Sequence, residues 1–491
     1  MAEQFIHSLN NNPNIVPFKY DRSQVTPGVC HIGVGNFHRA HLEYYTNLLL
    51  GKDATQKNWA ICGLMLLPFD EKLYNALSAQ NGCYSVRVCA RADGKDETYA
   101  IGSLVQLIYG VKDPEAVINK LADSSIKVLT MTITEGGYNM DKKTGEFDLN
   151  EPKVKHDLSD RDHPSTVFGF VAAGLRRRKE QNHGPITILS CDNLQHNGDT
   201  CKRAFGTFIK AQDPELYAWV EKNVTFPNSM VDRITPAVTP DDITRLNKIN
   251  GIEDKAPIYT EDFIQWVIED NFIAGRPKWE EVGAQFCKDV TAFENMKLSL
   301  LNASHSLLCY PAFYGGYRKV DAAMRDERIV KYVEQFMDKD ITPYVPEPPQ
   351  INLNEYKKSL VERFANKTVS DQIARLCFDG AAKVPVYIMP NLIKMVRDNK
   401  ELTRVTFFFA MYRHYLRSTK DFKGVEYKVN DPWLTEHDWE LIRADDPIVF
   451  LKASPFEATD LTQSEAFKKQ YLEFVQRLLK EDPLEIIKSF L

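Results

Sequence analysis

A chain of 491 residues is long enough for roughly two or three domains around a large buried core. Its residues are 43% hydrophobic and 26% charged, and its formal net charge at pH 7 is −6. This balance lacks the basic excess that nucleic acids and membrane surfaces attract, so it argues against both as partners.

The start of the chain and its apolar runs favour a cytoplasmic protein. Residues Met1–His7 lack the basic segment and apolar run of a secretory signal peptide. The strongly apolar stretches, such as Val405–Tyr412, are far too short to cross a bilayer. We therefore expect no membrane association, and because no coiled-coil seam is present we expect a monomer.

Four apolar or β-branched runs in the first part of the chain have the continuous character of strands buried on both faces. Segments with helical spacing separate them, which is the alternation of an α/β domain around a largely parallel sheet. The predicted strands are Gly28–Gly33, Trp59–Leu66, Lys127–Thr134 and Pro185–Ser190.

The first predicted strand runs into Gly33-Val-Gly-Asn-Phe-His-Arg39, followed by a helix that we expect to begin near Ala40. A Gly-x-Gly turn between strand and helix lets the backbone approach a pyrophosphate and aims the helix N-terminus at it. His38 replaces the third glycine of the usual fingerprint, so a simple glycine turn remains the alternative. On the cofactor interpretation, residues 1–290 form a Rossmann-type dinucleotide-binding domain, and Arg39 adds a charge-assisted contact to phosphate. The candidate cofactor-binding residues of this turn are Gly33, Gly35, Asn36, Phe37, His38 and Arg39.

The end of the second predicted strand bears on the choice between NAD and NADP. NAD enzymes usually place a carboxylate there, where it binds the ribose hydroxyls. Asp70 is the candidate, although it lies a few residues late and also suits a helix cap after Pro68. Because no Arg or Lys precedes Lys72 in this turn, the sequence favours NAD over NADP as the cofactor.

No metal site is expected. The nine cysteines show no Cys-x-x-Cys pair, which indicates reduced, mostly buried thiols rather than a zinc site. His31, His38 and His41 straddle the first strand, the turn and the helix, and we interpret them as structural or phosphate-adjacent residues.

Beyond about Glu294 the strand signals nearly vanish, and we expect a mainly helical substrate and catalytic domain over residues 291–491. A ligand would then bind between the two domains, where sites tend to occur. Seven segments carry helical spacing: Met296–Tyr310, Asp326–Lys339, Asn354–Asn366, Asp371–Phe378, Leu392–Asn399, Leu402–Ser418 and Ser464–Lys480.

The helix that opens the second domain carries a lysine, an amide and an imidazole. At about 100° per residue of an α-helix, Asn302 lies about 140° and His305 about 80° around the axis from Lys297. These three groups in one pocket suit chemistry on an alcohol or carbonyl, where a proton moves and an oxyanion needs donors. The alternative is an amphipathic helix whose polar residues face water.

Six stretches of the chain together carry a resemblance to a known family. They are His31–His41, Thr132–Tyr138, Ser190–Gly198, Pro227–Pro236, Phe263–Phe272 and Lys297–His305. With them the chain resembles the polyol-specific long-chain dehydrogenase/reductase family, most closely its mannitol 2-dehydrogenases, over essentially its whole length. The resemblance implies a metal-independent, NAD-dependent oxidation of a sugar alcohol at C2 to the 2-ketose, and the reverse reduction, with D-mannitol and D-fructose as the pair.

The resemblance also implies roles for five catalytic residues. Lys297 would be the general acid/base, and Asn193 and Asn302 would form the oxyanion hole. His305 would orient the substrate, and Glu135 would take part in proton passage between the site and solvent. From the residues alone, Asn193 also suits a turn after a strand, and Glu135 with its two glycines suits a plain turn.

Three further positions would contact the substrate hydroxyls or shape the pocket: Asp232, Arg375 and Lys383. This expectation comes from the resemblance alone. By their own pattern, Arg375 and Lys383 would be interpreted as surface charges.

Alternative functions remain open at this point. Fructuronate (hexuronate) reductases of the same family commonly carry Glu-Lys-Gly-Tyr, and a lysine there suits a substrate carboxylate. This chain has Glu135-Gly-Gly-Tyr138, which favours an uncharged polyol. Arabinitol or sorbitol could replace mannitol, and a non-catalytic regulator that binds NAD or a sugar is a further alternative from another class.

Overall fold

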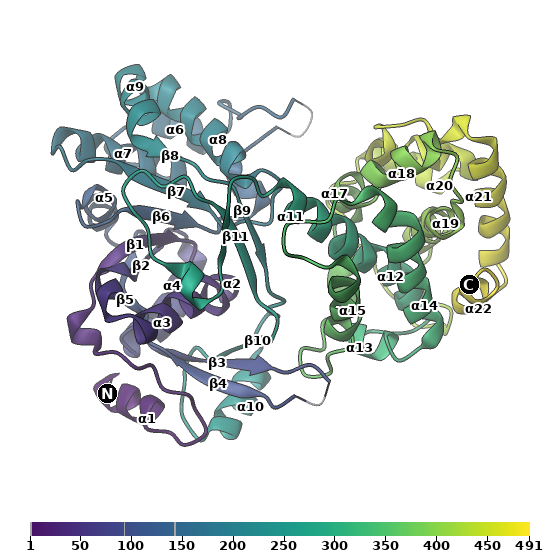
Figure 1. Ribbon diagram of the computed structural model, residues 1–491. Coiled ribbons are helices and arrows are strands. Elements are labelled where there is room, and N and C mark those ends of the chain that lie inside the picture. Colours follow the sequence, from purple (N-terminus) through teal and green to yellow (C-terminus); the bar gives the residue numbers. More distant parts are fainter. Residues whose placement is uncertain (1, 93, 142–143) are drawn as a thin grey trace. The chain divides into compact units, whose positions relative to one another are not determined.

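The computed structural model describes residues 2–92, 94–141 and 144–491, which divide into two units, Met1–Thr291 and Ala292–Leu491 (Figure 1). The first unit is built around strands, and the second is helical. That the first binds a dinucleotide and the second a substrate stays a prediction.

A six-stranded parallel sheet forms the centre of the first unit, in the order β5-β2-β1-β6-β7-β8. This is the strand order of the Rossmann fold, with its reversal between β1 and β6, so the predicted fold class is confirmed. All six residues of β2 and five of six in β1 are buried, as their apolar sequences require. The strands are β1 Pro27–Ile32, β2 Ala60–Met65, β5 Leu104–Tyr109, β6 Val128–Met131, β7 Ile186–Ser190 and β8 Val224–Thr225.

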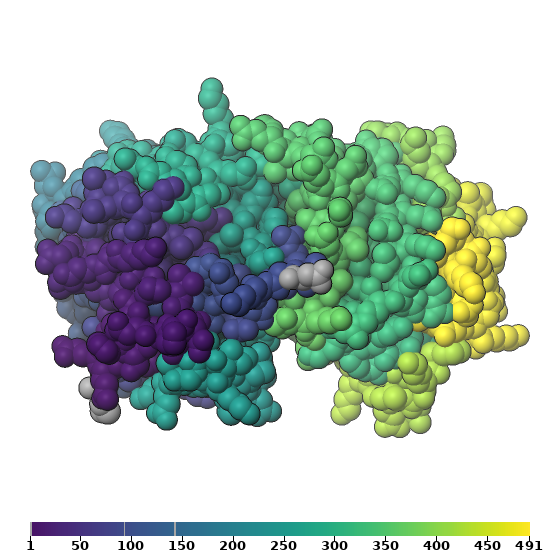
Figure 2. All heavy atoms as spheres, turned by 60° about the horizontal axis from the view of Figure 1, so that its bottom comes forward, coloured from purple at the N-terminus to yellow at the C-terminus, as the bar shows by residue number. Residues whose placement is uncertain are grey.

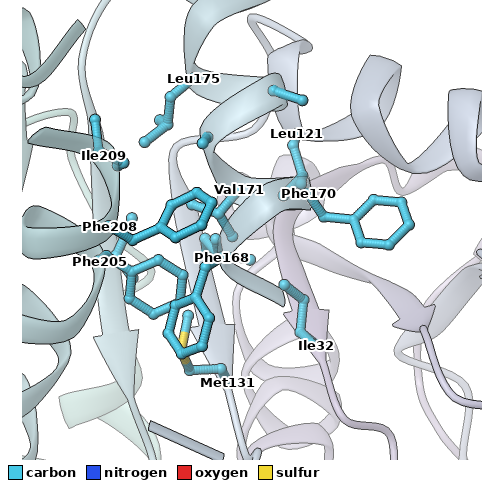
Figure 3. Close-up of a cluster of buried hydrophobic side chains, with 14 of the residues drawn as sticks. Ile32, Leu121, Met131, Phe168, Phe170, Val171, Leu175, Phe205, Phe208 and Ile209 are labelled. Atoms are coloured by element: carbon cyan, nitrogen blue, oxygen red, sulfur yellow. The ribbon is translucent and has the colours of Figure 1, made fainter. Parts of the chain in front are cut away.

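Helices of the first unit pack against this sheet. Figure 3 shows aromatic residues of α7 and α8 gathered over Ile32 of β1 and Met131 of β6, with Phe168 and Phe205 ring centroids 5.0 Å apart. A second cluster, centred on α3, β10 and β11, contains Trp266 and Trp279. The helices are α1 Ala2–Asn10, α2 Asn36–Ala40, α3 Leu42–Lys52, α4 Glu71–Ala79, α5 Pro114–Ala122, α6 Pro152–Ser159, α7 Val167–Glu180, α8 Asn197–Gln212, α9 Pro214–Asn223 and α10 Pro240–Asn250.

Two small mixed sheets complete the first unit, and the sequence did not predict them. One has the order β10-β3-β4 and the other β12-β11-β9. The purple N-terminal segment lies beside teal residues of α10 (Figure 2), where the Asn12 side chain donates to the carbonyl of Asn250 at 2.7 Å. The strands are β3 Tyr84–Cys89, β4 Glu97–Ile101, β9 Ser229–Asp232, β10 Ile258–Glu261, β11 Gln265–Glu269 and β12 Gln285–Cys287.

Two predicted boundaries in this unit are wrong. The helix after the first strand, α2, begins at Asn36 rather than near Ala40, because Gly35 already has the extended backbone of an N-cap. The strand predicted to reach Thr134 ends at Met131. Beyond it, the N–H groups of Ile133 and Thr134 donate to the Asp192 carboxylate instead of to a neighbouring strand.

The second unit contains helices in all seven predicted segments, so its helical character is confirmed. Two turns within it are π-helical, Lys297–Asn302 and Phe336–Ile341. Among the described residues, no helix is both long and apolar enough to span a membrane. The helices are α11 Thr291–Met296, which crosses the boundary, α12 Ala303–Tyr314, α13 Val320–Ala323, α14 Glu327–Gln335, α15 Leu353–Phe364, α16 Ile373–Cys377, α17 Gly380–Tyr387, α18 Met389–Arg397, α19 Thr403–Arg417, α20 Glu436–Arg443, α21 Glu465–Leu478 and α22 Pro483–Lys488.

Candidate active site

The turn between β1 and α2 contains two glycines with different surroundings. Gly33 has φ +95°, and a Cβ there would lie 2.1 Å from the carbonyl oxygen of Thr132, so only glycine fits. At Gly35 a Cβ would meet no other atom nearer than the Gly33 oxygen at 3.8 Å, which leaves the space over its Cα open. Gly35 also caps α2 without a side chain. This arrangement fits the close approach of a cofactor pyrophosphate to the backbone.

The side chains of His38 and Arg39 support this turn from inside the unit. The guanidinium of Arg39 donates to the carbonyl of Ala256 at 2.6 Å and to Asn36 Oδ1 at 2.7 Å. The His38 ring stacks on His31 with centroids 3.4 Å apart, and both His38 and Arg39 are buried. Contact of either side chain with the cofactor stays a prediction. Both side chains act on the turn through Asn36 and through the packing beneath it.

Glu43 of α3 completes a buried network under the turn. Its carboxylate lies 2.8 Å from His38 Nδ1 and accepts a hydrogen bond from the Tyr84 hydroxyl at 2.6 Å. Burial raises the pKa of Glu43 to about 7, against the opposing effects of Tyr84 and Arg39. Burial also lowers the pKa of His38 well below its usual value, so this imidazole is neutral near pH 7.

Asp70 caps the turn after β2. Its Oδ2 accepts a hydrogen bond from the backbone N–H of Leu67 at 2.9 Å, which is the cap that the sequence left open as an alternative. Phe69 beside it is 78% exposed. Contact of Asp70 with a ribose stays a prediction.

The carboxyl ends of β6 and β7 bring Glu135 and Asn193 to the same edge of the sheet. Both side chains are exposed, and between them lies the buried carboxylate of Asp192. Asp192 accepts hydrogen bonds from the N–H groups of Ile133 and Thr134 at 3.0 and 2.8 Å. In open α/β sheets this edge is where ligands bind.

Two other candidates of the first unit lie near strand ends. Asp232 is the last residue of β9, is 5% exposed and pairs in register with Gln265 of β11. Gly136, where hexuronate reductases carry lysine, is exposed, and a Cβ there would meet nothing within 4 Å. The chain therefore has room for a side chain at this position and does not use it.

In the second unit, Lys297 and Asn302 open and close a π-helical turn. The N–H of Ala303 donates to the carbonyl of Leu298, five residues back, which is the π pattern. The predicted separation of about 140° is wrong here, because residues five apart in a π-turn stack along one face. Lys297 is buried, at 7% exposure, and among the described residues Asn302 Oδ1 has no hydrogen-bond partner.

His305 lies on the next turn in a buried setting. Its ring packs on Phe364 with centroids 4.2 Å apart. Burial lowers its pKa to about 3; Asp371 opposes this shift, and the cations Arg375, Arg363 and Lys383 add to it. Near pH 7 the imidazole is therefore neutral and can both donate and accept a hydrogen bond.

Arg375 and Lys383 have structural partners of their own. Arg375 is exposed and forms an ion pair with Asp371 one turn earlier. The Lys383 amine donates to three carbonyls at the end of α16, nearest Phe378 at 2.8 Å, and lies 2.6 Å from Asp379. Lysine at a helix C-terminus stabilises the exposed carbonyls. Contact of either cation with a substrate stays a prediction.

Three residues of these regions were not predicted from the sequence. Asp192 directly precedes Asn193, and its acidic side chain at the end of a buried strand was the available signal. Glu294 is a buried carboxyl one helical turn before Lys297, and its apolar surroundings were the available signal. Asn391 on α18 donates to Ser299 Oγ at 2.9 Å within the π-turn, and no sequence signal links two residues 92 positions apart.

Within the described ranges, no group of three or more His, Cys, Asp or Glu side chains is arranged to hold a metal ion. The histidines of the first turn have other partners: His31 Nδ1 lies 2.8 Å from Thr130 Oγ1, and His41 Nε2 lies 2.9 Å from the Gln265 carbonyl. All nine cysteines are free.

Comparisons with known proteins match both units. The family model described as the mannitol dehydrogenase Rossmann domain matches residues 27–281. The model described as the mannitol dehydrogenase C-terminal domain matches residues 289–479. Together they cover most of the chain.

Individual relatives match over nearly their whole lengths. A polyol:NADP oxidoreductase of Gluconobacter oxydans is 40% identical over 96% of both chains. A mannitol 2-dehydrogenase of Neosartorya fischeri is 37% identical over 96% of this chain and 95% of its own.

Two solved structures share the fold of the chain. A D-sorbitol dehydrogenase in substrate-free form has a TM-score of 0.90 and 37% identity, over 98% of this chain and 99% of its own. The Pseudomonas fluorescens mannitol 2-dehydrogenase, in a ternary complex with NAD and D-mannitol, has a TM-score of 0.88 and 36% identity, over 98% of both chains.

Proposed function

The chain belongs to the mannitol dehydrogenase family, and we propose that it catalyses the NAD-dependent oxidation of a sugar alcohol at C2 to the 2-ketose and the reverse reduction. D-mannitol and D-fructose are the proposed pair. One observation carries this proposal: similarity at 36% identity over 98% of the chain to a protein solved with NAD and D-mannitol. The placement of Lys297 and Asn302 on one face of a π-turn supports it.

In the oxidation, the Lys297 amine accepts the proton of the C2 hydroxyl while the C2–H bond breaks. The bound nicotinamide supplies the hydride acceptor. The amides of Asn193 and Asn302 donate hydrogen bonds to the oxygen as negative charge develops on it. Neutral His305 orients the hydroxyl, and Glu135 passes the proton from Lys297 toward solvent. In the reduction, Lys297 returns the proton to the carbonyl oxygen.

Lys297 needs a depressed pKa for this role. An ordinary lysine with a pKa near 10.4 is deprotonated in only about 0.1% of molecules near pH 7.4. Its burial supplies one favourable influence, because removal from water disfavours the charged form. The rate of alcohol oxidation should therefore rise with pH as Lys297 loses its proton.

NAD is the proposed cofactor, with Gly33, Gly35, Asn36 and Phe37 at the pyrophosphate turn and Asp70 near the ribose. The absence of Arg and Lys between Leu66 and Glu71 in the sequence leaves the 2′-phosphate of NADP without a cation at this turn. The competing cofactor is NADP, because a relative at 40% identity is named a polyol:NADP oxidoreductase.

D-sorbitol is the second candidate substrate. The observation that favours it is the D-sorbitol dehydrogenase structure with a TM-score of 0.90. A hexuronate is disfavoured by Gly136, because no cation stands at that position to bind a substrate carboxylate. A non-catalytic regulator would have no use for a buried lysine beside an amide donor.

We also propose a cytoplasmic enzyme that works as a monomer. Nine free cysteines, eight of them buried, suit a reducing compartment. Light scattering on the purified protein tests the monomer, for which the expected mass is 56.3 kDa.

Initial rates of reduction test the substrate and the cofactor. The substrate is tested by comparing D-fructose with D-fructuronate, each with NADH. The cofactor is tested by comparing NADH with NADPH on D-fructose. The proposal predicts fast D-fructose reduction with NADH and a weak rate on D-fructuronate. A preference for D-fructuronate would contradict the polyol assignment, and a preference for NADPH would contradict the cofactor. D-sorbitol and D-mannitol oxidation rates decide between the two alcohols.

A further inference from the structure

We propose that Asp192 is a positioning residue that fixes two proposed catalytic segments at once, the strand end that carries Asn193 and the loop that carries Glu135. This inference rests on the proposed function for its effect on catalysis. It rests on the geometry of the first unit for the contacts themselves.

The Asp192 carboxylate holds the loop after β6 by three hydrogen bonds. Its Oδ2 accepts from the N–H of Ile133 and from the Tyr138 hydroxyl, at 3.0 and 2.7 Å, and its Oδ1 accepts from the N–H of Thr134 at 2.8 Å. The carboxylate is 6% exposed, so water does not compete freely for these donors. Both oxygens are needed, because the two backbone donors use different ones.

The loop held in this way contains an unfavourable backbone conformation. Thr134 has φ +67°, in the left-handed region that a β-branched residue rarely adopts. Such a residue persists only where its surroundings over-determine it. The N–H of Thr134 is one of the donors to Asp192, and Glu135 follows directly, so the carboxylate fixes the direction in which Glu135 leaves the loop.

Tyr138, which donates to this carboxylate, also reaches the strand end before Asn193, and Asn197 holds the same backbone from the other side. The Tyr138 hydroxyl also contacts Ser190 Oγ at 2.6 Å, at the end of β7. The Asn197 amide donates to the carbonyls of Ser190 and Asp192 at 3.2 and 3.0 Å. Asn193 therefore projects from a backbone that is fixed before and after it.

The ionisation of Asp192 makes this arrangement sensitive to pH. Burial raises the pKa of Asp192 to about 6, nearby Glu135 adds to the rise, and the donors Tyr138, Ile133 and Thr134 oppose it. Cys191 and Cys201 are the other titratable groups close to this carboxylate. Below about pH 6 the carboxyl gains a proton. The protonated oxygen then becomes a hydrogen-bond donor and faces an N–H or O–H group that is also a donor. Without the Tyr138 hydroxyl the pKa of Asp192 rises further.

Tyr138→Phe is the variant that tests the inference, with Tyr20→Phe as its matched control. Tyr20→Phe also removes a phenol hydrogen bond, the one to Asn47 at 2.7 Å. Tyr20 lies outside the segments after β6 and β7 that carry Glu135 and Asn193. Amide hydrogen exchange is followed over residues 132–138 as a function of pH. D-fructose reduction is followed in parallel. That direction requires protonated Lys297, so loss of the Lys297 proton restricts it only on the alkaline side.

Wild type is expected to lose protection of residues 132–138, and reductase activity, as the pH falls through about 6. In Tyr138→Phe both midpoints should move to higher pH, while Tyr20→Phe keeps the wild-type midpoints. Asp192→Asn should lose roughly ten- to a hundredfold in kcat at every pH, with a smaller change in KM.

Unchanged exchange midpoints in Tyr138→Phe would overturn the inference, whatever the activity. Shifted exchange midpoints with an unchanged activity profile would overturn the catalytic part of it. Wild type without any polyol or ketose turnover would instead contradict the proposed function, and the exchange data would still decide whether Asp192 holds the loop.

Discussion

Beneath the Gly33–Gly35 turn, the buried carboxyl of Glu43 contacts His38 and Tyr84. Burial raises its pKa from the ordinary 4.5 to about 7. A carboxyl with a raised pKa in the folded protein makes its full contribution to stability below about pH 4.5 and loses it as the pH rises through 7. The shift corresponds to an upper value of roughly 3–4 kcal/mol.

We predict that Glu43→Gln weakens the pH dependence of the free energy of unfolding between about pH 5 and pH 8. Glutamine retains an acceptor for the Tyr84 hydroxyl but cannot ionise, so the variant should gain stability relative to wild type as the pH rises. Urea unfolding at several pH values measures this. A difference between variant and wild type that stays constant with pH would show that Glu43 does not titrate in this range.

The turn between β1 and α2 separates a folding requirement from a binding requirement. Gly33 combines φ +95° with a Cβ position 2.1 Å from the Thr132 oxygen. The Gly35 Cβ position has open space above it. The two residues should therefore respond differently to the same substitution.

Gly33→Ala is predicted to destabilise the protein by more than about 2 kcal/mol, through strain and the close contact with Thr132. Gly35→Ala should keep the wild-type melting temperature but raise the dissociation constant for NADH by roughly tenfold or more, as the methyl group occupies the pyrophosphate approach. Thermal unfolding and NADH fluorescence titration measure the two effects. Equal NADH affinity in Gly35→Ala and wild type would exclude this turn from the cofactor site.

The π-turn Lys297–Asn302 is a second element whose geometry serves the proposed reaction. It aligns Lys297 and Asn302 on one face, which an α-helix would not do. Ser299 within the turn accepts a hydrogen bond from Asn391 of α18, a residue that is 3% exposed. We infer that this bond helps to hold the turn in its π form.

Ser299→Ala should therefore lower kcat roughly tenfold, with little effect on KM. The control is Thr403→Ala, which removes a comparable bond from Gln470 at 2.7 Å elsewhere in the same unit. Ser299→Ala should lose about 1–3 kcal/mol of stability, because the buried amide of Asn391 is left without its partner. Thr403→Ala should lose less, because Gln470 is only half-buried and water can replace the bond. If both variants keep wild-type kcat, the bond from Asn391 has no bearing on catalysis.

For the whole molecule, the sequence predicted what local periodicity determines. Continuous apolar runs identified four of the six strands of the parallel sheet, and helical spacing identified seven segments of the second unit. Some strands of the two small sheets, such as Gln285–Cys287 with three residues, are too short for a recognisable pattern. Their positions depend on pairing with distant segments.

The parts of the candidate site that escaped prediction depend on contacts rather than on patterns. The inward direction of Arg39 follows from its bonds to Ala256 and Asn36, and the residue type alone does not reveal it. The π-turn at Lys297 breaks the regular spacing that a helical wheel assumes. The hydrogen bonds from the loop after β6 to Asp192 require the ends of β6 and β7 to be adjacent, which only the sheet order provides.

In the proposed reaction, a buried lysine moves the proton of the polyol without a metal ion. The most direct test is the pH profile of kcat/KM for D-mannitol oxidation with NAD, after chelator treatment, in wild type and Lys297→Ala. We predict that chelated wild type keeps its rate, which rises with pH through one titration. Lys297→Ala should lose roughly 10²–10⁴-fold and that titration with it. The same titration in Lys297→Ala would exclude Lys297 as the group that moves the proton, and loss of wild-type activity on chelation would show that a metal ion takes part.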